Sequence, residues 1–324
     1  MSEYLIEVNN LTKRFPITGG IFGREVGSVS AVNNVSFKIP KGQTLGLVGE
    51  SGCGKTTLGR SLLRLIEPTS GEVKFKGENI IEYDSVKMRS MRRKMQIIFQ
   101  DPYASLNPRM TIGDILREPM DIHGLFKGKE ARKKRLYELV DQVQLQRDAL
   151  NKYPHEFSGG QRQRVCIARA LAVEPEFIVC DEPVSALDVS VQAQVVNLLM
   201  DLQKDLGLTY LFIAHDLKVV EYISQRVAVM YLGNMVELAT SSEIYGHARH
   251  PYTKALFSAI PTPRPGEKKE RIILQGDIPS PMNPPTGCHF HPRCWKASEQ
   301  CRERYPQVTD QSESHLYRCF HPIE

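Results

Sequence analysis

A run of eight residues near the N-terminus limits the folds open to this chain of 324 residues: Gly49-Glu50-Ser51-Gly52-Cys53-Gly54-Lys55-Thr56. It matches the pattern G-x-x-x-x-G-K-[ST]. Residues 44–48 before it have the composition of a buried strand, and residues 56–66 after it carry apolar side chains at helical spacing. Glycines let successive backbone N–H groups turn toward one ligand, and the helix adds the positive end of its dipole. The run therefore predicts a polyphosphate site in an α/β fold.

Residue types in the run suggest separate roles. We expect Lys55 to reach the β- and γ-phosphates and Thr56 to bind Mg²⁺. Cys53 is interpreted as a small space-filling residue rather than a redox switch. The other predicted phosphate-contacting residues are Gly49, Ser51, Gly52, Gly54 and Thr57.

A second motif follows a strand-like stretch. Residues 177–180 are apolar, and two acids, Asp181 and Glu182, come directly after them. Successive side chains of a strand point in opposite directions, so one acid can hold a metal while the other faces a water molecule. We predict that Asp181 binds Mg²⁺ and that Glu182 is the general base.

The rest of the chain alternates between strand and helix patterns. Residues 5–15 and 32–39 are predicted strands, with a Gly-rich inserted loop at 16–30 and short strand-like runs over 72–100. The composition is helical over about 101–172. Strands return at 177–180 and 210–214, on either side of a predicted helix. This order predicts a largely parallel sheet wrapped by helices, with a helical insertion.

Charge and hydropathy exclude some classes of protein. The net charge is only +5, and the basic clusters at 87–94 and 127–135 are interpreted as solvated helix faces, with anionic lipid or a polar partner as the alternative. No nucleic-acid partner is expected. No apolar run approaches the roughly 18 residues that a membrane helix needs, and the acidic start lacks the basic, then apolar, pattern of a secretory signal. We expect a cytosolic location.

The character of the chain changes near residue 250. Nine of the 20 prolines lie within residues 251–292, so neither regular helix nor central strand is expected there. The predicted domains are 1–250 and 251–324. Four of the seven cysteines lie in the second: Cys288, Cys294, Cys301 and Cys319. Their spacings fit neither zinc ribbons nor bacterial ferredoxins, so an iron-sulfur cluster, Zn²⁺ and four unligated thiols remain open.

A third motif points to a family. Residues 157–164 read Phe-Ser-Gly-Gly-Gln-Arg-Gln-Arg, Gln100 follows a strand, Ser185-Ala186-Leu187-Asp188 follows the acids, and His215 follows the next strand. Over about residues 5–250 the order and spacing resemble the nucleotide-binding subunits of ATP-binding cassette (ABC) transporters. One departure is Phe157, where the family usually has Leu; both are apolar.

This resemblance implies a fold and residue roles. The fold is α/β: a P-loop NTPase core with an antiparallel β subdomain, a helical subdomain at about 101–172 and an irregular C-terminal extension. Ser158, Gly159, Gly160 and Gln161 would face the γ-phosphate of ATP bound to an opposite subunit. Gln100 would sense Mg²⁺ and the attacking water, His215 would steady the γ-phosphate and Glu182, and Asp188 would bridge the dimer. Phe15 stands where relatives stack an aromatic ring on adenine, with a core position as the alternative.

Residues 101–109 and 153–160, together with the Pro-rich extension, resemble the ATPases of bacterial oligopeptide and dipeptide importers, in particular the second of the two that such systems carry. The resemblance implies ATP, Mg²⁺ and a [4Fe-4S] cluster as cofactors. Implied partners are a related second ATPase, two permease subunits and a peptide-binding protein, which would hold the chain at the cytoplasmic face of the membrane. Alternatives are a nickel-chelate importer, self-association and, more remotely, a soluble ABC ATPase of DNA repair or translation.

Overall fold

A computed structural model describes residues 3–19, 24–260, 271–310 and 314–324. The chain forms two compact units, which we describe separately. The helical unit comprises Met1–Leu5, Ile39–Gln43 and Glu82–Ile213. The P-loop unit comprises Ile6–Lys38, Thr44–Ile81 and Ala214–Glu324.

The helical unit is built on three parallel strands, β6 (Met95–Ile98), β7 (Phe177–Asp181) and β8 (Thr209–Ile213). The strand β7 lies between the other two, and every residue of β7 and β8 is buried. Continuous apolar sequences of this kind are typical of strands covered on both faces. The carboxyl end of β7, where the acidic pair begins, is therefore fixed on both sides.

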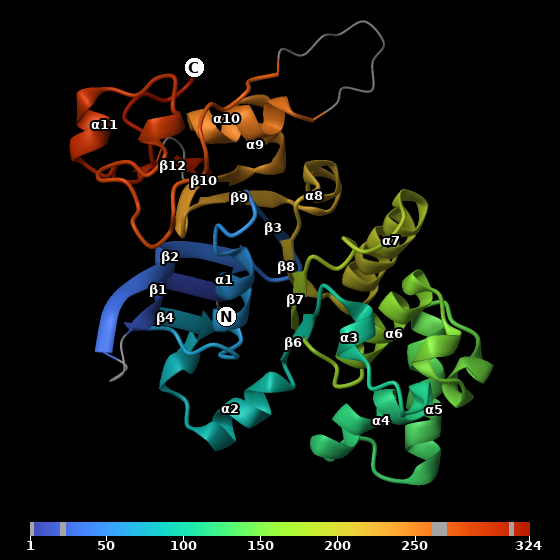
Figure 1. Ribbon diagram of the computed structural model, residues 1–324. Coiled ribbons are helices and arrows are strands. Elements are labelled where there is room, and N and C mark those ends of the chain that lie inside the picture. The colour runs from blue at the N-terminus through green and yellow to red at the C-terminus, as the bar shows by residue number, and fades with distance from the viewer. Residues whose placement is uncertain (1–2, 20–23, 261–270, 311–313) are drawn as a thin grey trace, which may run out of the picture. The chain divides into compact units, whose positions relative to one another are not determined.

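Helices make up most of this unit (Figure 1). They are α2 (Ser85–Arg92), α3 (Pro102–Ser105), α4 (Ile112–Ile122), α5 (Lys129–Gln142), α6 (Gly159–Leu171) and α7 (Val189–Leu206), with 3₁₀ turns at Arg147–Asn151 and Pro154–Glu156. A further 3₁₀ turn, Ile80–Glu82, spans the boundary in sequence between the two units. Polar side chains mark where several of them begin. Asp101 accepts backbone N–H groups at the start of α3, and Thr111 does so at the start of α4.

The helix α2 corrects one expectation, since short strands were expected throughout 72–100. The side chain of Asp84 accepts a hydrogen bond of 2.7 Å from the backbone N–H of Lys87, which caps a helix. Lys87, Arg89 and Arg92 are exposed while Met88 is buried. The first basic cluster is therefore a solvated helix face, as expected.

In the P-loop unit, one sheet has the strand order β2-β1-β4-β5. Its strands are β1 (Tyr4–Gly19), β2 (Arg24–Pro40), β4 (Ser70–Phe75) and β5 (Glu78–Asn79). The interpretation of residues 16–30 as a loop is wrong for its described part, because β1 runs to Gly19 and β2 starts at Arg24. Residues 20–23 lie outside the described residues. The β-branched residues Ile17, Thr18, Val26 and Val29 favour strand despite the neighbouring glycines.

The other strands of this unit connect the phosphate-loop strand to the C-terminal extension. The strand β3 (Thr44–Val48) pairs in parallel with β9 (Arg226–Tyr231). Antiparallel pairs then join β9 to β10 (Asn234–Thr240), β10 to β12 (Leu316–Tyr317), and β12 to β11 (Thr309–Asp310). The extension thus continues the sheet that carries the phosphate loop.

Helices of this unit are α1 (Lys55–Leu62), α8 (Leu217–Ile223), α9 (Ser241–Gly246), α10 (Pro251–Ser258) and α11 (Glu299–Glu303), with a 3₁₀ turn at His291–Arg293. The helix α10 corrects the expectation that residues 251–292 form no regular helix. Pro251 is its first residue, where no N–H donor is needed. Most of the charged stretch 267–271 lies outside the described residues. Within the described ranges, no helix has the length and hydropathy of a membrane span.

Candidate nucleotide-binding site

Two glycines shape the turn after β3. Gly49 has a φ of +151° and Gly54 a φ of +104°. A Cβ at Gly49 would collide with the carbonyl oxygen of Met230, and one at Gly54 with that of Ala31. Only glycine fits a backbone packed this closely in such conformations. The loop is therefore a tight ring of backbone, as the motif predicted.

Lys55 lies inside this ring and is 6% exposed. Its Nζ donates hydrogen bonds to the carbonyl oxygens of Gly49 at 2.8 Å and Glu50 at 3.1 Å. The helix α1 begins here with Gly54 as its N-cap, and no side chain caps it. The ammonium group and the helix N-terminus together give the loop the positive charge that a polyphosphate needs.

The remaining loop residues lie around this ring. Burial raises the pKa of Cys53, although the nearby Lys55 opposes the shift. The Cys53 side chain is 4% exposed, which supports its interpretation as a space-filling residue. Ser51 and Gly52 are exposed, and Thr56 and Thr57 are half-buried.

The acidic pair lies in the helical unit. Asp181 ends β7 and is 2% exposed. Glu182 follows with a φ of +49°, and its N–H donates to the carbonyl oxygen of Ile213 at 3.0 Å. Gln100 Nε2 donates to Glu182 Oε2 at 2.7 Å. The structure thus brings together Gln100 and Glu182, two of the predicted catalytic residues, from the ends of neighbouring parallel strands.

The Ser-Gly-Gly-Gln motif begins α6. Ser158 is the N-cap: its hydroxyl accepts the N–H of Gln161 at 3.4 Å, and its own N–H donates to Gln161 Oε1 at 3.0 Å. This is a capping box. Ser158, Gly159 and Gln161 are exposed, so this helix N-terminus is accessible, while Phe157 before it is buried.

The other predicted residues also have defined positions. Asp188 is exposed at the N-cap of α7. His215 is exposed in the P-loop unit, directly before Asp216, the N-cap of α8. Phe15 on β1 is 39% exposed, with Lys13 Nζ 4.9 Å from its ring centroid. An exposed ring is compatible with base stacking, and the alternative of a core phenylalanine is not met.

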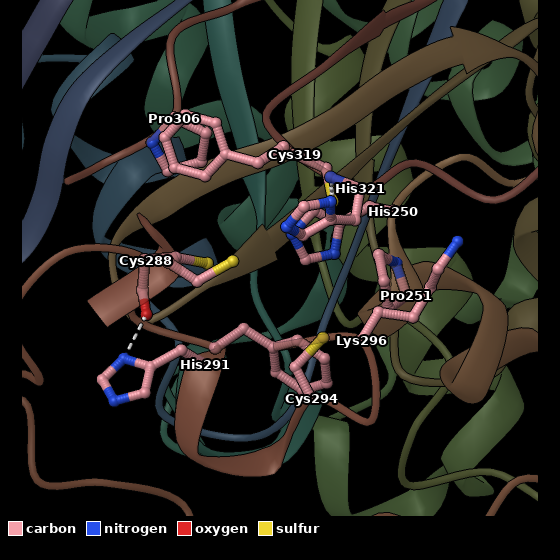
Figure 2. Close-up of a pocket in the computed structure, with 12 residues that line it drawn as sticks. His250, Pro251, Cys288, His291, Cys294, Lys296, Pro306, Cys319 and His321 are labelled. Carbon is pink, nitrogen blue, oxygen red and sulfur yellow. Dashed lines mark hydrogen bonds between the residues drawn. The ribbon is translucent and has the colours of Figure 1, made fainter. Parts of the chain in front are cut away.

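The four cysteines of the extension line one pocket, shown in Figure 2. Burial raises the pKa of Cys288 to about 11 and that of Cys319 to about 12. The backbone N–H of Cys288 donates to the carbonyl oxygen of Cys301 at 2.8 Å. Among the residues that the structure describes, no group of three or more His, Cys, Asp or Glu side chains is arranged to hold a metal ion.

Sequence reasoning missed one residue next to the phosphate loop. Arg293, in the cysteine-rich segment, pairs with Glu50, which is a variable position of the loop motif. The two residues are 243 positions apart. No local pattern signals such a contact.

The sequence matches known protein families and individual transport proteins. A family model described as "ABC transporter" matches residues 32–185, and one described as "Oligopeptide/dipeptide transporter, C-terminal region" matches residues 236–301. The chain is 52% identical over 320 residues to the oligopeptide transport ATP-binding protein AppF of Bacillus subtilis, covering 98% of this chain and 97% of AppF. It is also 52% identical over 317 residues to the dipeptide transport ATP-binding protein DppF of Haemophilus influenzae, covering 98% and 96%.

Solved structures agree with these matches. The ATP-binding cassette MJ0796 bound to ADP and Pi has a TM-score of 0.64 at 29% identity, covering 73% of this chain and 98% of that one. The cassette cbiO1 from Clostridium perfringens has a TM-score of 0.65 at 26% identity, covering 76% and 92%. Nearly all of each solved cassette is therefore matched, while part of this chain has no counterpart in either structure. The chain belongs to the ABC transporter ATP-binding proteins, in the branch that carries the oligopeptide/dipeptide transporter C-terminal region.

Proposed function

We propose that this chain hydrolyses ATP to drive the import of peptides through a membrane ABC transporter. The observation that carries the proposal is the combination of an ATP-binding loop with the peptide-transporter C-terminal region in one compact unit. The relatives named for oligopeptide and dipeptide transport align with the chain over nearly its whole length. The chain would work at the cytoplasmic face of the membrane, held there by permease subunits.

The proposed catalytic roles follow from side-chain chemistry. Backbone N–H groups of Gly49 and of residues 51–57, together with the Lys55 ammonium, would bind the phosphates of ATP. Thr56, Gln100 and the buried carboxylate of Asp181 offer the oxygen ligands that Mg²⁺ prefers. Glu182 would accept the proton of the attacking water while Gln100 orients it. His215 would steady the γ-phosphate, and Phe15 would stack on adenine.

A second chain would complete the site. The exposed N-terminus of α6, with Ser158 to Gln161, carries the positive end of the helix dipole, which suits the γ-phosphate of ATP held by another subunit. Asp188 would contact that subunit. ATP then stabilises the closed dimer by binding it better than the open one, and hydrolysis removes that stabilisation. We expect this second subunit to be a related but different ATPase, with two permeases and a peptide-binding protein as further partners.

Co-purification with membrane proteins and peptide uptake test this function. The complex would be reconstituted in vesicles with its co-purifying permeases and binding protein, and uptake of labelled peptides would be measured with and without ATP. Lys55→Ala is the matched control and should abolish uptake. Uptake of a nickel chelate instead of peptides would support the nickel-importer alternative. Failure to associate with any permease would contradict the transport function.

We also infer that Cys288, Cys294, Cys301 and Cys319 hold a [4Fe-4S] cluster. All four line one pocket, which supports a shared ligand. Each sulfur that binds a single Zn²⁺ lies about 2.3 Å from the metal. Each thiolate of a cluster binds a different iron, so the cysteine sulfurs stand farther from one another. Among the described residues no group of side chains is arranged to hold a metal ion, so the shared pocket alone supports the cluster. Bound there, it would join four points of the extension.

Iron analysis and absorbance near 400 nm on anaerobically purified protein test this cofactor. A brown protein with iron and acid-labile sulfide is expected. Replacing all four cysteines by serine should remove both. A colourless, zinc-loaded protein would support the zinc alternative, and a metal-free protein with four titratable thiols would contradict both.

A further inference from the structure

The contact between Arg293 and Glu50 joins the cysteine-rich segment to the phosphate loop. Arg293 Nη1 donates to Glu50 Oε2 at 2.7 Å, and Nη2 donates to Glu50 Oε1 at 3.0 Å. This is a bidentate pair, the strongest geometry of an Arg–carboxylate contact. The side chains are only 7% and 23% exposed, so solvent screens the pair much less than it screens a surface ion pair.

The surroundings of Arg293 keep it in place. The next residue, Cys294, lines the cysteine pocket, and Phe290, also in its lining, is 1% exposed. The Phe290 ring centroid lies 5.3 Å from that of Tyr231 and 5.4 Å from that of Tyr252. Arg293 Nη1 also lies 3.5 Å from the Tyr231 hydroxyl. The aromatic cluster of Tyr231, Tyr252 and Phe290 therefore supports the cysteine-rich segment and, with it, Arg293.

Glu50 is held at its backbone as well. Its N–H donates to the Tyr252 hydroxyl at 2.9 Å, and its carbonyl oxygen accepts from Lys55 Nζ. Residue 50 thus has its side chain and its N–H fixed by Arg293 and Tyr252, which both come from the far end of the chain. The N–H of this residue is therefore directed to Tyr252 and not to a phosphate.

A second path connects the same elements. His289 Nδ1 lies 2.9 Å from Nδ2 of Asn234, which begins β10 directly after the turn that follows β9. In that turn, the N–H of Gly233 donates to the carbonyl oxygen of Cys53 in the loop at 3.0 Å. Glu50 and Cys53 of the phosphate loop are therefore both linked to the segment 289–293, Glu50 directly and Cys53 through the turn at Gly233.

Charge explains why the loop needs this contact. Glu50 places a carboxylate in a loop that must bind a polyphosphate, and like charges at partly buried positions repel each other strongly. The Arg293 guanidinium neutralises that carboxylate and holds it by two hydrogen bonds. We propose that Arg293 is a positioning residue for ATP binding, which lets the phosphate loop accept ATP by pairing with Glu50. The proposal rests on the assignment of residues 49–56 as the ATP-binding loop.

Equilibrium binding of MgATP to the full-length chain, measured by isothermal titration calorimetry, tests the proposal. Arg293→Ala should raise the Kd by roughly 10- to 100-fold, because it leaves the Glu50 charge unpaired beside the phosphates. Glu50→Gln should bind ATP within a few-fold of wild type. The double variant Glu50→Gln/Arg293→Ala should recover most of the affinity lost in Arg293→Ala, since the repelling charge is gone.

Controls separate this effect from unfolding and from a wrong site assignment. Arg302→Ala removes an exposed arginine of the same extension and should leave the Kd unchanged. Arg293→Lys keeps the charge without the bidentate geometry and should give an intermediate Kd. It also serves as the test if Arg293→Ala does not fold. An Arg293→Ala loss that persists in full in the Glu50→Gln background would overturn the proposal, as would an unchanged Kd in folded Arg293→Ala. ATP binding by Lys55→Ala at wild-type affinity would instead refute the loop assignment.

Discussion

Glu182 has a backbone conformation that residues with side chains rarely adopt. Its φ of +49° follows directly after buried β7, and its carbonyl oxygen accepts hydrogen bonds from both the N–H and the hydroxyl of Ser185. Such a conformation costs of order 1 kcal/mol or more and persists where the surroundings enforce it, often at a functional site. Here it turns the carboxylate toward Gln100.

Glu182→Gln should therefore retain ATP binding and lose roughly 10²- to 10⁴-fold in ATP turnover, the range for loss of a general base. The amide keeps the shape of the side chain but cannot accept the proton. Phosphate release and ATP affinity would be measured on the same preparation, with Glu130→Gln, an exposed acid of the helical unit, as the control for a change in surface charge. Turnover within threefold of wild type would show that another group is the base.

Three buried cysteines should be unreactive in the folded chain. Burial raises the pKa values of Cys53, Cys166 and Cys180, and only the thiolate is a good nucleophile. Iodoacetamide at pH 7.5 should leave these three unlabelled in native protein and label them in urea, as read by peptide mass spectrometry. Rapid native labelling of Cys53 would contradict its space-filling role and indicate an opening loop.

At the scale of elements, local signals predicted most of what is local. The phosphate loop, buried β7, α6 and the helical region after residue 100 follow from glycines, apolar runs and caps within a few residues of each other. The predictions were wrong where two local signals disagreed. Glycines led to a predicted loop where β1 and β2 extend, and prolines led to the prediction of no helix where α10 lies, although Pro251 suits a first turn. The pairing of β10 with β12 has no local signature.

Glu237 links β10 to the residues just before α10 and β12 through buried hydrogen bonds. It lies on β10, is 1% exposed, and accepts the N–H groups of Arg249 at 2.6 Å and His250 at 2.9 Å just before α10. His315 Nε2, before β12, lies 2.7 Å from its Oε1. One carboxylate thus satisfies polar groups from two parts of the extension.

Glu237→Ala should destabilise the extension by about 3 kcal/mol or more, because it leaves several buried donors without an acceptor. Glu237→Gln keeps one acceptor oxygen and should cost less. Trp295, the single tryptophan of the chain, lies in the extension, so its fluorescence in urea reports this unfolding. Exposed Glu221→Ala is the control. Equal midpoints of urea unfolding for Glu237→Ala and this control would show that the contacts of Glu237 add no stability.

At the scale of the whole molecule, sequence motifs and long-range contacts answer different questions. The order of motifs identified the cassette, because each motif carries its own chemistry. The contact of Arg293 with Glu50 could not be predicted, since it depends on how β9, β10 and α10 fold the extension back beside the loop. The phosphate loop of this chain therefore contacts a residue of the extension.

A change in the cysteine pocket should therefore alter the affinity of the chain for MgATP. Cys294→Ser weakens the pocket next to Arg293, so the segment 288–294 should exchange its amide hydrogens faster and the Kd for MgATP should rise several-fold, up to the value of Arg293→Ala. Cys166→Ser alters a buried cysteine in the helical unit and should leave both quantities unchanged. Hydrogen exchange followed by mass spectrometry and calorimetry would be run on the same samples. Faster exchange in 288–294 with an unchanged Kd would mean that the segment moves without moving Arg293 from Glu50, and the pocket and the phosphate loop would then be independent.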